Sequence, residues 1–307
     1  MARDLSYLGG YLPLFAGTEV VRRSNLLAPP LLASLPPPNT PPVKAAMISW
    51  WDFEENNSTP GLLDSGGYGN HFVTNTNSNL LHAAGAGKVG LAFSRGGEAG
   101  SVNGRLMYIP RASGSLLDLG PTDSFSMGLW FNPERAQDSN WGRMVLGRLA
   151  GTTAPSGGST GLGGKLNSSY GFSYYAGAFV FNLFTNVADA TSYAVTAPYP
   201  PVGTWAFFVV TVDVPNHSMK LYQNGTLYTS NTIPSGPRKG PTVQGNFCMS
   251  HPMYADQTGD TDFDVRQTAG RIDSAFVVAK VLTPTEVTAL YNGGGGVNYS
   301  QFLALNI

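Results

Sequence analysis

Short segments in which apolar and polar residues alternate run through most of the chain after Met47. Alternation with a period of two is typical of a β-strand with one buried face, and turn residues separate the segments at short intervals. Several strands with this spacing indicate an all-β sandwich of two sheets. We expect strands at residues 90–93, 107–109, 125–131, 144–147, 179–183, 205–214, 220–223, 226–229 and 274–278.

The strongest local signal is a hairpin centred on Asn224 and Gly225. Two alternating segments, residues 220–223 and 226–229, flank this pair. Both central residues of a type I′ turn need positive φ, which Asn and Gly tolerate. The sequence therefore predicts a tight β-hairpin at this point.

One helix is predicted near the C-terminus. Thr283 suits the N-cap, Pro284 the first helical position, and Glu286 completes a capping box. Gly293 stands where a left-handed C-cap belongs. The helix would dock on the sandwich through Val287, Leu290 and Tyr291.

Apolar residues of the expected strands can fill the space between two sheets, because small or polar residues alternate with them. We expect the interior to contain Trp51, Phe53, Phe93, Phe125, Leu129, Phe131, Phe207, Val209, Leu221, Ile272 and Phe276. Cys248 is the only cysteine, which excludes an intrachain disulfide and favours a small buried residue.

Residues 1–45 have a different composition, with leucine and proline dominating residues 26–42. Proline fixes φ and lacks a backbone donor, so we expect extended, polyproline-like backbone. Such a segment cannot bury its own leucines, which must enter a groove on this protein or on another. We interpret it as an anchoring or interaction arm, with contacts made by Leu26, Leu27, Leu31, Leu32 and Leu35.

Charge is scarce along the chain. Charged residues make up 12% and the net charge is −1, whereas about 25% is usual. This scarcity fits either a loop-rich β composition or a surface that packs against neighbouring proteins. The charge gives no basis for binding nucleic acid or an anionic membrane. No secretory signal is recognised, and no apolar stretch is long enough to span a bilayer.

Eight motifs follow one another between residues 50 and 293. Residues 64–71 read Asp-Ser-Gly-Gly-Tyr-Gly-Asn-His, which is similar to an Asp-x-Ser-Gly-x-Gly-Asn turn. Residues 87–93 form a Gly-x-x-Gly-x-Ala-Phe strand and residues 221–225 a Leu-Tyr-x-Asn-Gly hairpin. The others are residues 50–54, 125–131, Trp205, 270–273 and 282–293. In this order they resemble the laminin-G-like branch of the concanavalin A-like lectin/glucanase superfamily.

The resemblance implies a jelly-roll sandwich of two curved antiparallel sheets with one short C-terminal helix. It covers residues 46–297. The chain is therefore expected to have three parts, namely an extended arm at residues 1–45, a jelly roll at 46–297 and a C-terminal tail at 298–307.

The resemblance also raises the question of catalysis, because the superfamily includes glycosidases. Glycoside hydrolysis needs two carboxylates on opposite sides of the scissile bond, often presented on a strand as Glu-x-Asp-x-x-Glu. That motif is absent, and the acidic pairs available are Glu54 with Glu55 and Asp262 with Asp264. No nucleophile with a partner base is recognised, so we expect a protein that is not an enzyme and requires no cofactor.

Members of the superfamily often hold one structural calcium ion. The resemblance points to Asp64 and Asp273 as its candidate ligands. As an alternative, Asp64 caps its own turn, since an Asp side chain accepts from backbone amides two residues on.

Sugar binding would use exposed aromatic rings beside polar side chains. Tyrosines and tryptophans in expected loops are the candidates, above all Trp141, Tyr174, Tyr193 and Tyr254. Alternatively, these side chains cover the sandwich edges or line a protein interface, where Tyr and Trp are also enriched.

The combination of arm, low charge and lectin-like domain suggests a non-enzymatic virion protein of a bacteriophage. The arm would bind other virion proteins within a homo-oligomer or larger assembly, and the domain would recognise a surface or host glycan. One alternative is a free bacterial carbohydrate-binding lectin, extracellular or on the cell surface. A glycoside hydrolase is the weaker alternative.

Overall fold

The computed structural model describes residues 41–55, 61–74, 87–94, 107–110, 116–120, 122–136, 143–150, 168–175, 177–186, 191–233, 244–250 and 268–307. Contacts divide the chain into two compact units, Met1–Thr40 and Pro41–Ile307. All described residues belong to the second unit. The predicted anchor residues of the arm lie outside them: Leu26, Leu27, Leu31, Leu32 and Leu35.

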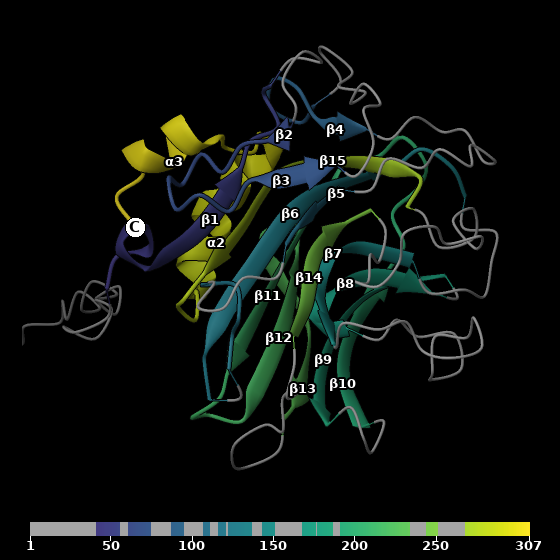
Figure 1. The fold of residues 1–307 in the computed structure, drawn as a ribbon, viewed down its shortest axis with the longest axis vertical. Helices are drawn as coiled ribbons and strands as arrows, with labels where there is room; N and C mark the ends of the chain where they lie inside the picture. Colours follow the sequence, from purple (N-terminus) through teal and green to yellow (C-terminus); the bar gives the residue numbers. More distant parts are fainter. Residues whose placement is uncertain are drawn as a thin grey trace, which may run out of the picture. The chain divides into compact units, whose positions relative to one another are not determined.

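Two antiparallel sheets form the body of the second unit (Figure 1). The seven-stranded sheet has the order β1 (Met47–Trp51), β15 (Gly270–Val278), β6 (Phe125–Pro133), β11 (Ala206–Asp213), β12 (Ser218–Gln223) and β13 (Thr226–Thr232), and β4 (Phe93–Ser94) pairs with β15. The eight-stranded sheet has the order β10 (Thr191–Pro198), β9 (Ala178–Asn186), β8 (Ser168–Tyr175), β7 (Arg143–Ala150), β14 (Gln244–Met249), β5 (Met107–Ile109), β3 (Phe72–Thr74) and β2 (Gly61–Leu62). This architecture confirms the predicted all-β sandwich.

The interior between the sheets holds a large aromatic and aliphatic cluster. It contains eight of the predicted interior residues, namely Trp51, Phe53, Phe93, Phe125, Leu129, Phe131, Leu221 and Ile272. The interior position expected for Phe207, Val209 and Phe276 is wrong, because they lie in a second cluster on the outer face of the seven-stranded sheet. Their neighbours Phe208, Val210 and Val277 face inward instead.

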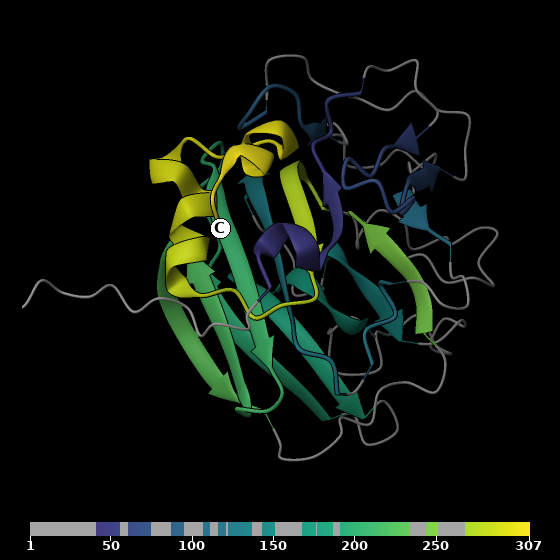
Figure 2. The same cartoon turned by 90° about the vertical axis from the view of Figure 1, so that its left-hand side faces the viewer.

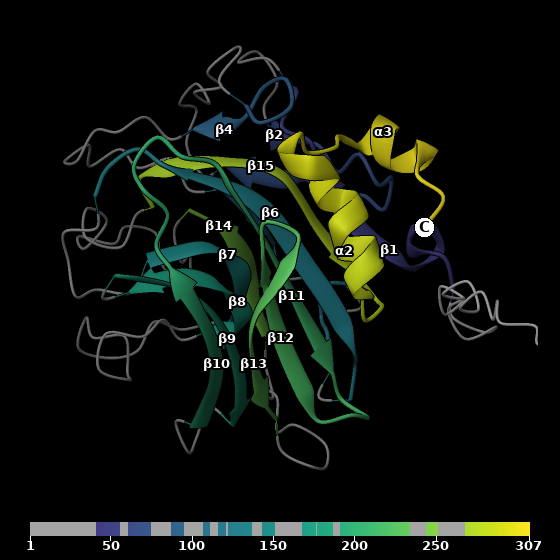
Figure 3. The ribbon, with the colours of Figure 1, turned by 180° about the vertical axis from the view of Figure 1, so that it is seen from behind.

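The second cluster exists because helices cover that outer face. Figures 2 and 3 show α2 (Pro284–Tyr291) and α3 (Tyr299–Ala304) on this side, with the 3-10 turn η2 (Asn292–Gly294) between them. Val287 and Leu290 are buried there, as predicted. No helix within the described ranges is long and apolar enough to cross a membrane.

The start of α2 follows its sequence signal closely. Thr283 caps the helix and forms the predicted capping box with Glu286. The predicted C-cap differs, because Asn292 takes the left-handed conformation at the cap with φ 51°. Gly293 follows it with φ 59°. Asn is the residue other than Gly that most readily adopts this conformation, so the helix ends one residue earlier.

The predicted hairpin joins β12 to β13. Asn224 and Gly225 have φ values of 50° and 80°, which confirms the type of turn expected from this pair. The Asn224 side chain also accepts a hydrogen bond from the Phe207 amide at 3.0 Å. The turn is thereby attached to the neighbouring strand β11.

Residues 298–307, which the sequence suggested as a tail, pack onto the sandwich. Asn298 and Gln301 form a second capping box, which starts α3. Phe302 is fully buried, and its ring stacks on that of Trp50 with centroids 4.9 Å apart. Apolar burial of Phe302 holds this segment to the domain.

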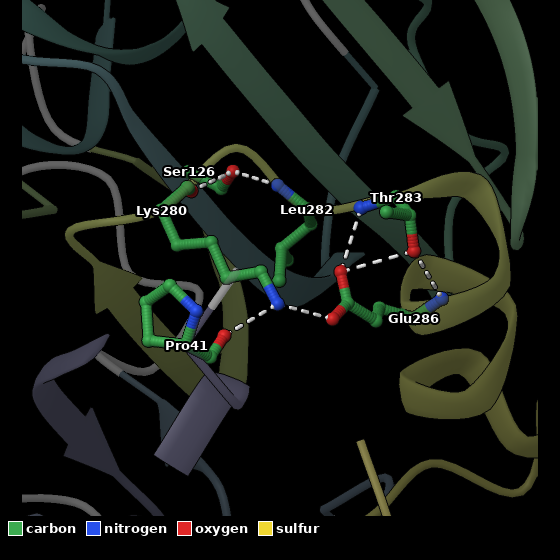
Figure 4. Close-up of polar contacts among 6 residues, drawn as sticks. All are labelled: Pro41, Ser126, Lys280, Leu282, Thr283 and Glu286. Carbon is green, nitrogen blue, oxygen red and sulfur yellow. Dashed lines mark hydrogen bonds and ion pairs between the residues drawn. The ribbon is translucent and has the colours of Figure 1, made fainter. Parts of the chain in front are cut away.

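The first described residues are held by a buried ammonium group (Figure 4). The Lys280 Nζ atom donates to the Pro41 carbonyl at 2.8 Å and pairs with Glu286 at 2.5 Å. Glu286 also accepts from the Thr283 amide within the helix cap. The 3-10 turn η1 (Val43–Ala46) then leads into β1 with Val43 fully buried. Pro41 is therefore attached to the folded body through Lys280.

Candidate functional site

The four predicted sugar-binding aromatic residues divide into two groups. Trp141 and Tyr254 lie outside the described residues. Tyr174 and Tyr193 were expected in loops, but they lie on β8 and β10. Tyr174 is 1% exposed within the interior cluster, and Tyr193 packs against that cluster. Their positions pair with the inward-facing Phe179 and Leu183, so both rings face the core.

Asp64 organises the turn that follows β2. Its Oδ1 atom accepts from the Trp50 and Gly66 amides at 3.1 and 2.9 Å. Its Oδ2 atom accepts from the Asn70 amide at 3.2 Å and from the Ser49 hydroxyl at 3.5 Å. The side chain is 5% exposed. Asp64 thus caps its own turn and ties that turn to β1.

Asp273 has a similar role on another loop. Its Oδ2 atom accepts from the Lys88 and Val89 amides at 2.6 and 2.8 Å. The register of β15 shifts after Asp273, and Ser274 has a positive φ of 45°. Asp273 is fully buried, and this burial raises its pKa to about 7. The bulge turns the carboxyl group towards residues 87–91, where it holds the backbone.

The two predicted calcium ligands therefore belong to separate hydrogen-bond networks. N–H and O–H donors surround the carboxyl oxygens of Asp64, and backbone N–H groups surround Oδ2 of Asp273. Calcium sites collect six to eight oxygen ligands. Within the part of the chain that the structure describes, no group of three or more His, Cys, Asp or Glu side chains is arranged to hold a metal ion. The calcium site stays a prediction.

The turn that Asp64 caps presents an exposed aromatic ring. Tyr68 is 48% exposed, whereas most aromatic side chains of the described residues are buried. Gly67 and Gly69 on either side have φ values of 82° and 77°. An L side chain rarely adopts such values, so the two glycines allow the tight bend that lifts Tyr68 from the surface. Tyr68 is not among the sugar-binding candidates predicted from the sequence, although the flanking Gly67 and Gly69 signal an exposed turn.

A second tyrosine lies beside this turn. Burial raises the pKa of Tyr299, and the charges of Tyr68, Asp64 and Asp52 raise it further. Trp50 joins this turn to Tyr299: its backbone carbonyl accepts from the Ser65 amide at 2.7 Å, its amide donates to Asp64 at 3.1 Å, and its ring centroid lies 6.1 Å from that of Tyr299. We call Asp52, Asp64, Tyr68 and Tyr299 the Tyr68 corner.

Asp52 connects the two sides of the Tyr68 corner. Its carboxylate accepts from the Trp50 indole at 2.5 Å and from the Tyr299 amide at 2.8 and 3.0 Å. Burial raises the pKa of Asp52, and these two hydrogen bonds oppose the rise. Phe53 follows with a positive φ of 59° and a fully buried ring. This unusual backbone ends the strand, so that Asp52 and Glu54 both bind other loops.

The Tyr68 corner exposes an aromatic ring, while its carboxylates accept hydrogen bonds within the protein. Tyr68 offers a ring face and a hydroxyl group, which suit a ligand with an apolar face and polar edges. The carboxylates Asp52, Asp64 and Asp273 hold backbone amides, and Glu54 accepts from the Leu91 amide at 3.1 Å. The acid and base of a glycoside hydrolase must reach the substrate, whereas these four carboxylates are hydrogen-bonded to the backbone.

Comparison with protein families places most of the described domain in one group. Residues 108–288, more than half of the chain, match the family model of the concanavalin A-like lectin/glucanases superfamily. No curated protein matches the sequence.

Similar folds occur among the binding domains of botulinum neurotoxins. A neurotoxin DC binding domain in complex with rat synaptotagmin II has a TM-score of 0.57 and 14% identity, over 82% of this chain and 52% of that one. The same domain in complex with SialylT gives 0.56 and 13%, over 82% and 52%. The serotype G binding domain gives 0.54 and 15%, over 80% and 50%. This chain thus spans about half the length of these proteins, and such low identity shows the fold alone.

Proposed function

Because this chain belongs to the concanavalin A-like lectin/glucanases superfamily, we propose that it is a non-enzymatic recognition protein that binds a surface glycan at the Tyr68 corner. The observation that carries the proposal is Tyr68 itself, a half-exposed ring raised by two glycines with positive φ. Exposing such a ring to water has a free-energy cost, which a bound sugar face would offset. The neurotoxin domains in complex with synaptotagmin II and SialylT support this fold as a platform for recognition.

A non-catalytic role is favoured by the position of the acidic groups. The raised pKa of Asp273 is a property that a general acid needs, but its carboxyl group is fully buried and cannot reach a substrate. Asp52 already accepts from Trp50 and Tyr299. Neither carboxyl group is free to take part in glycoside hydrolysis.

The charge of the Tyr68 corner suggests the class of glycan. Asp52 and Asp64 belong to it, and Glu54 follows Asp52 along the chain. Like charges repel an anionic ligand and disfavour its binding. We therefore expect neutral oligosaccharides to bind in preference to sialylated ones.

A glycan array with the full chain tests the proposal. Replacing Tyr68 by alanine should reduce binding to the selected glycan about tenfold, since an aromatic contact contributes roughly 0.5–1.5 kcal/mol beyond its buried area. Tyr228→Ala is the matched control, because Tyr228 on β13 is 51% exposed. Equal binding by the wild type and Tyr68→Ala would refute the site. Trp141→Ala and Tyr254→Ala test the two candidates outside the described residues.

The larger role that we propose is that of a bacteriophage virion protein anchored by its N-terminal arm. The leucines and prolines of residues 26–42 and the low charge support it. Deleting residues 1–40 should abolish incorporation into particles while the domain still folds. The deletion must stop before Pro41, whose carbonyl accepts from the buried Lys280. A truncated chain that still incorporates would favour the alternative, a free bacterial lectin.

A further inference from the structure

The C-terminal helix α3 reaches the Tyr68 corner as a small separate element. Residues 295–298 connect it to the end of η2, and the Phe302 ring packs on Trp50. Its far end is held by the start of the domain, where Lys44 donates to the Leu303 carbonyl and the Val43 amide donates to the Ile307 carbonyl at 3.3 Å. Contacts at both of its ends therefore hold α3 in place.

At the near end of α3, that contact is Asp52. Both of its carboxylate oxygens accept from the Tyr299 amide, and Oδ1 also accepts from the Trp50 indole. The Tyr299 ring lies 6.1 Å from Trp50 and 5.9 Å from Phe302, measured between centroids. The Tyr299 amide thus donates to a charged acceptor, and its ring, which packs against Trp50 and Phe302, stays partly exposed.

We infer that Tyr299 is the second aromatic residue of the recognition site and that Asp52 is the residue that positions it. This inference rests on the proposed function and adds a ligand-contacting residue from the other end of the domain. Asp52 acts through Tyr299, because its own oxygens already accept from protein donors. Helix α3 therefore contributes Tyr299 to the binding site.

A double-mutant cycle in the full chain separates positioning from general stabilisation. The probe is the neutral oligosaccharide selected on the array, and the variants are Asp52→Asn, Tyr299→Ala and their combination. Each single variant should weaken binding about tenfold, in line with the loss of one charge-assisted hydrogen bond or one aromatic contact. The double variant should bind about as weakly as Tyr299→Ala alone, because both changes remove the same contact. Losses that multiply to about a hundredfold would overturn the positioning role.

Two controls complete the cycle. Tyr299→Phe keeps the ring and should bind within about twofold of the wild type, if the ring face makes the contact. Asp213→Asn is the second control, because the Asp213 carboxylate also accepts from a backbone amide, namely from Asn216 at 3.2 Å. It should leave binding unchanged. Wild-type binding by Tyr299→Ala would overturn the inference directly.

Amide hydrogen exchange decides the positioning role without any ligand. In Asp52→Asn, exchange of the Tyr299 amide should accelerate about tenfold or more, since its charged acceptor is lost. Amides of α2 should keep their wild-type rates. Unchanged exchange at Tyr299 would overturn the positioning role. If no glycan binds the wild type, the proposed function and the ligand role of Tyr299 both fail. The exchange rate of the Tyr299 amide still tests whether Asp52 positions Tyr299.

Discussion

The pH dependence of stability tests the role of the buried Asp273 carboxyl group. Burial raises its pKa from 3.8 to about 7, although the Val89 and Lys88 amides favour the charged form. The folded protein therefore binds this proton more tightly than the unfolded chain does. Because the folded state holds more protons between these two values, the free energy of unfolding must fall as pH rises from about 4 to about 7. The contribution is complete below pH 4 and lost above pH 7.

The size of the effect follows from the two pKa values. They differ by about 3, and each unit corresponds to about 1.36 kcal/mol, so the contribution of Asp273 is on the order of 4 kcal/mol. Asp273→Asn has no titrating group at this position, while Asp52 and Glu54 titrate in both proteins. The difference between the two stability profiles therefore isolates Asp273.

Urea unfolding of both proteins from pH 4 to pH 8 measures this difference. We expect the wild type to lose about 4 kcal/mol relative to Asp273→Asn across that range. Parallel profiles would refute the raised pKa. A wild type that gains stability relative to the variant as pH rises would show that hydrogen bonds from the amides of residues 88 and 89 outweigh burial.

Three further predictions concern stability. Asp64→Ala should lower the free energy of unfolding by about 3 kcal/mol, because buried amides lose their acceptor. The control Asp213→Ala should change it by less than about 1 kcal/mol. Urea titrations of both variants measure the difference. A chain that begins at Met47 should be less stable than one that begins at Pro41 by about 3 kcal/mol or more, because the buried Val43 and a partner of Lys280 are lost; equal melting temperatures would contradict this. EDTA should leave the melting temperature unchanged, since protein donors already occupy the carboxyl oxygens of Asp64; a fall would support the calcium site.

Local signals predicted local structure well. The Asn224-Gly225 pair gave the hairpin because both residues tolerate positive φ, and Thr283 with Glu286 gave the start of α2 because the capping box forms within four residues. The order of motifs along the chain predicted the sandwich for a similar reason, since each motif marks one strand or turn.

Positions that depend on packing between distant segments could not be predicted in this way. A period of two separates the two faces of a strand but does not tell which face meets the other sheet, so Phe207 and Val209 were assigned to the wrong face. Tyr174 follows polar residues that resemble a loop, yet it pairs across β8 and β9. The Tyr68 corner joins Tyr68 to Tyr299, more than two hundred residues later, which no local pattern encodes.

Chemical-shift mapping of the isotope-labelled chain tests most directly whether the Tyr68 corner binds a glycan. The neutral oligosaccharide selected on the array is titrated into the protein, and amide shifts are followed by NMR. We expect the largest changes at residues 65–71 and 299–301. Changes confined to other surfaces, such as β13 with its exposed Tyr228, would show that the glycan does not bind at the Tyr68 corner.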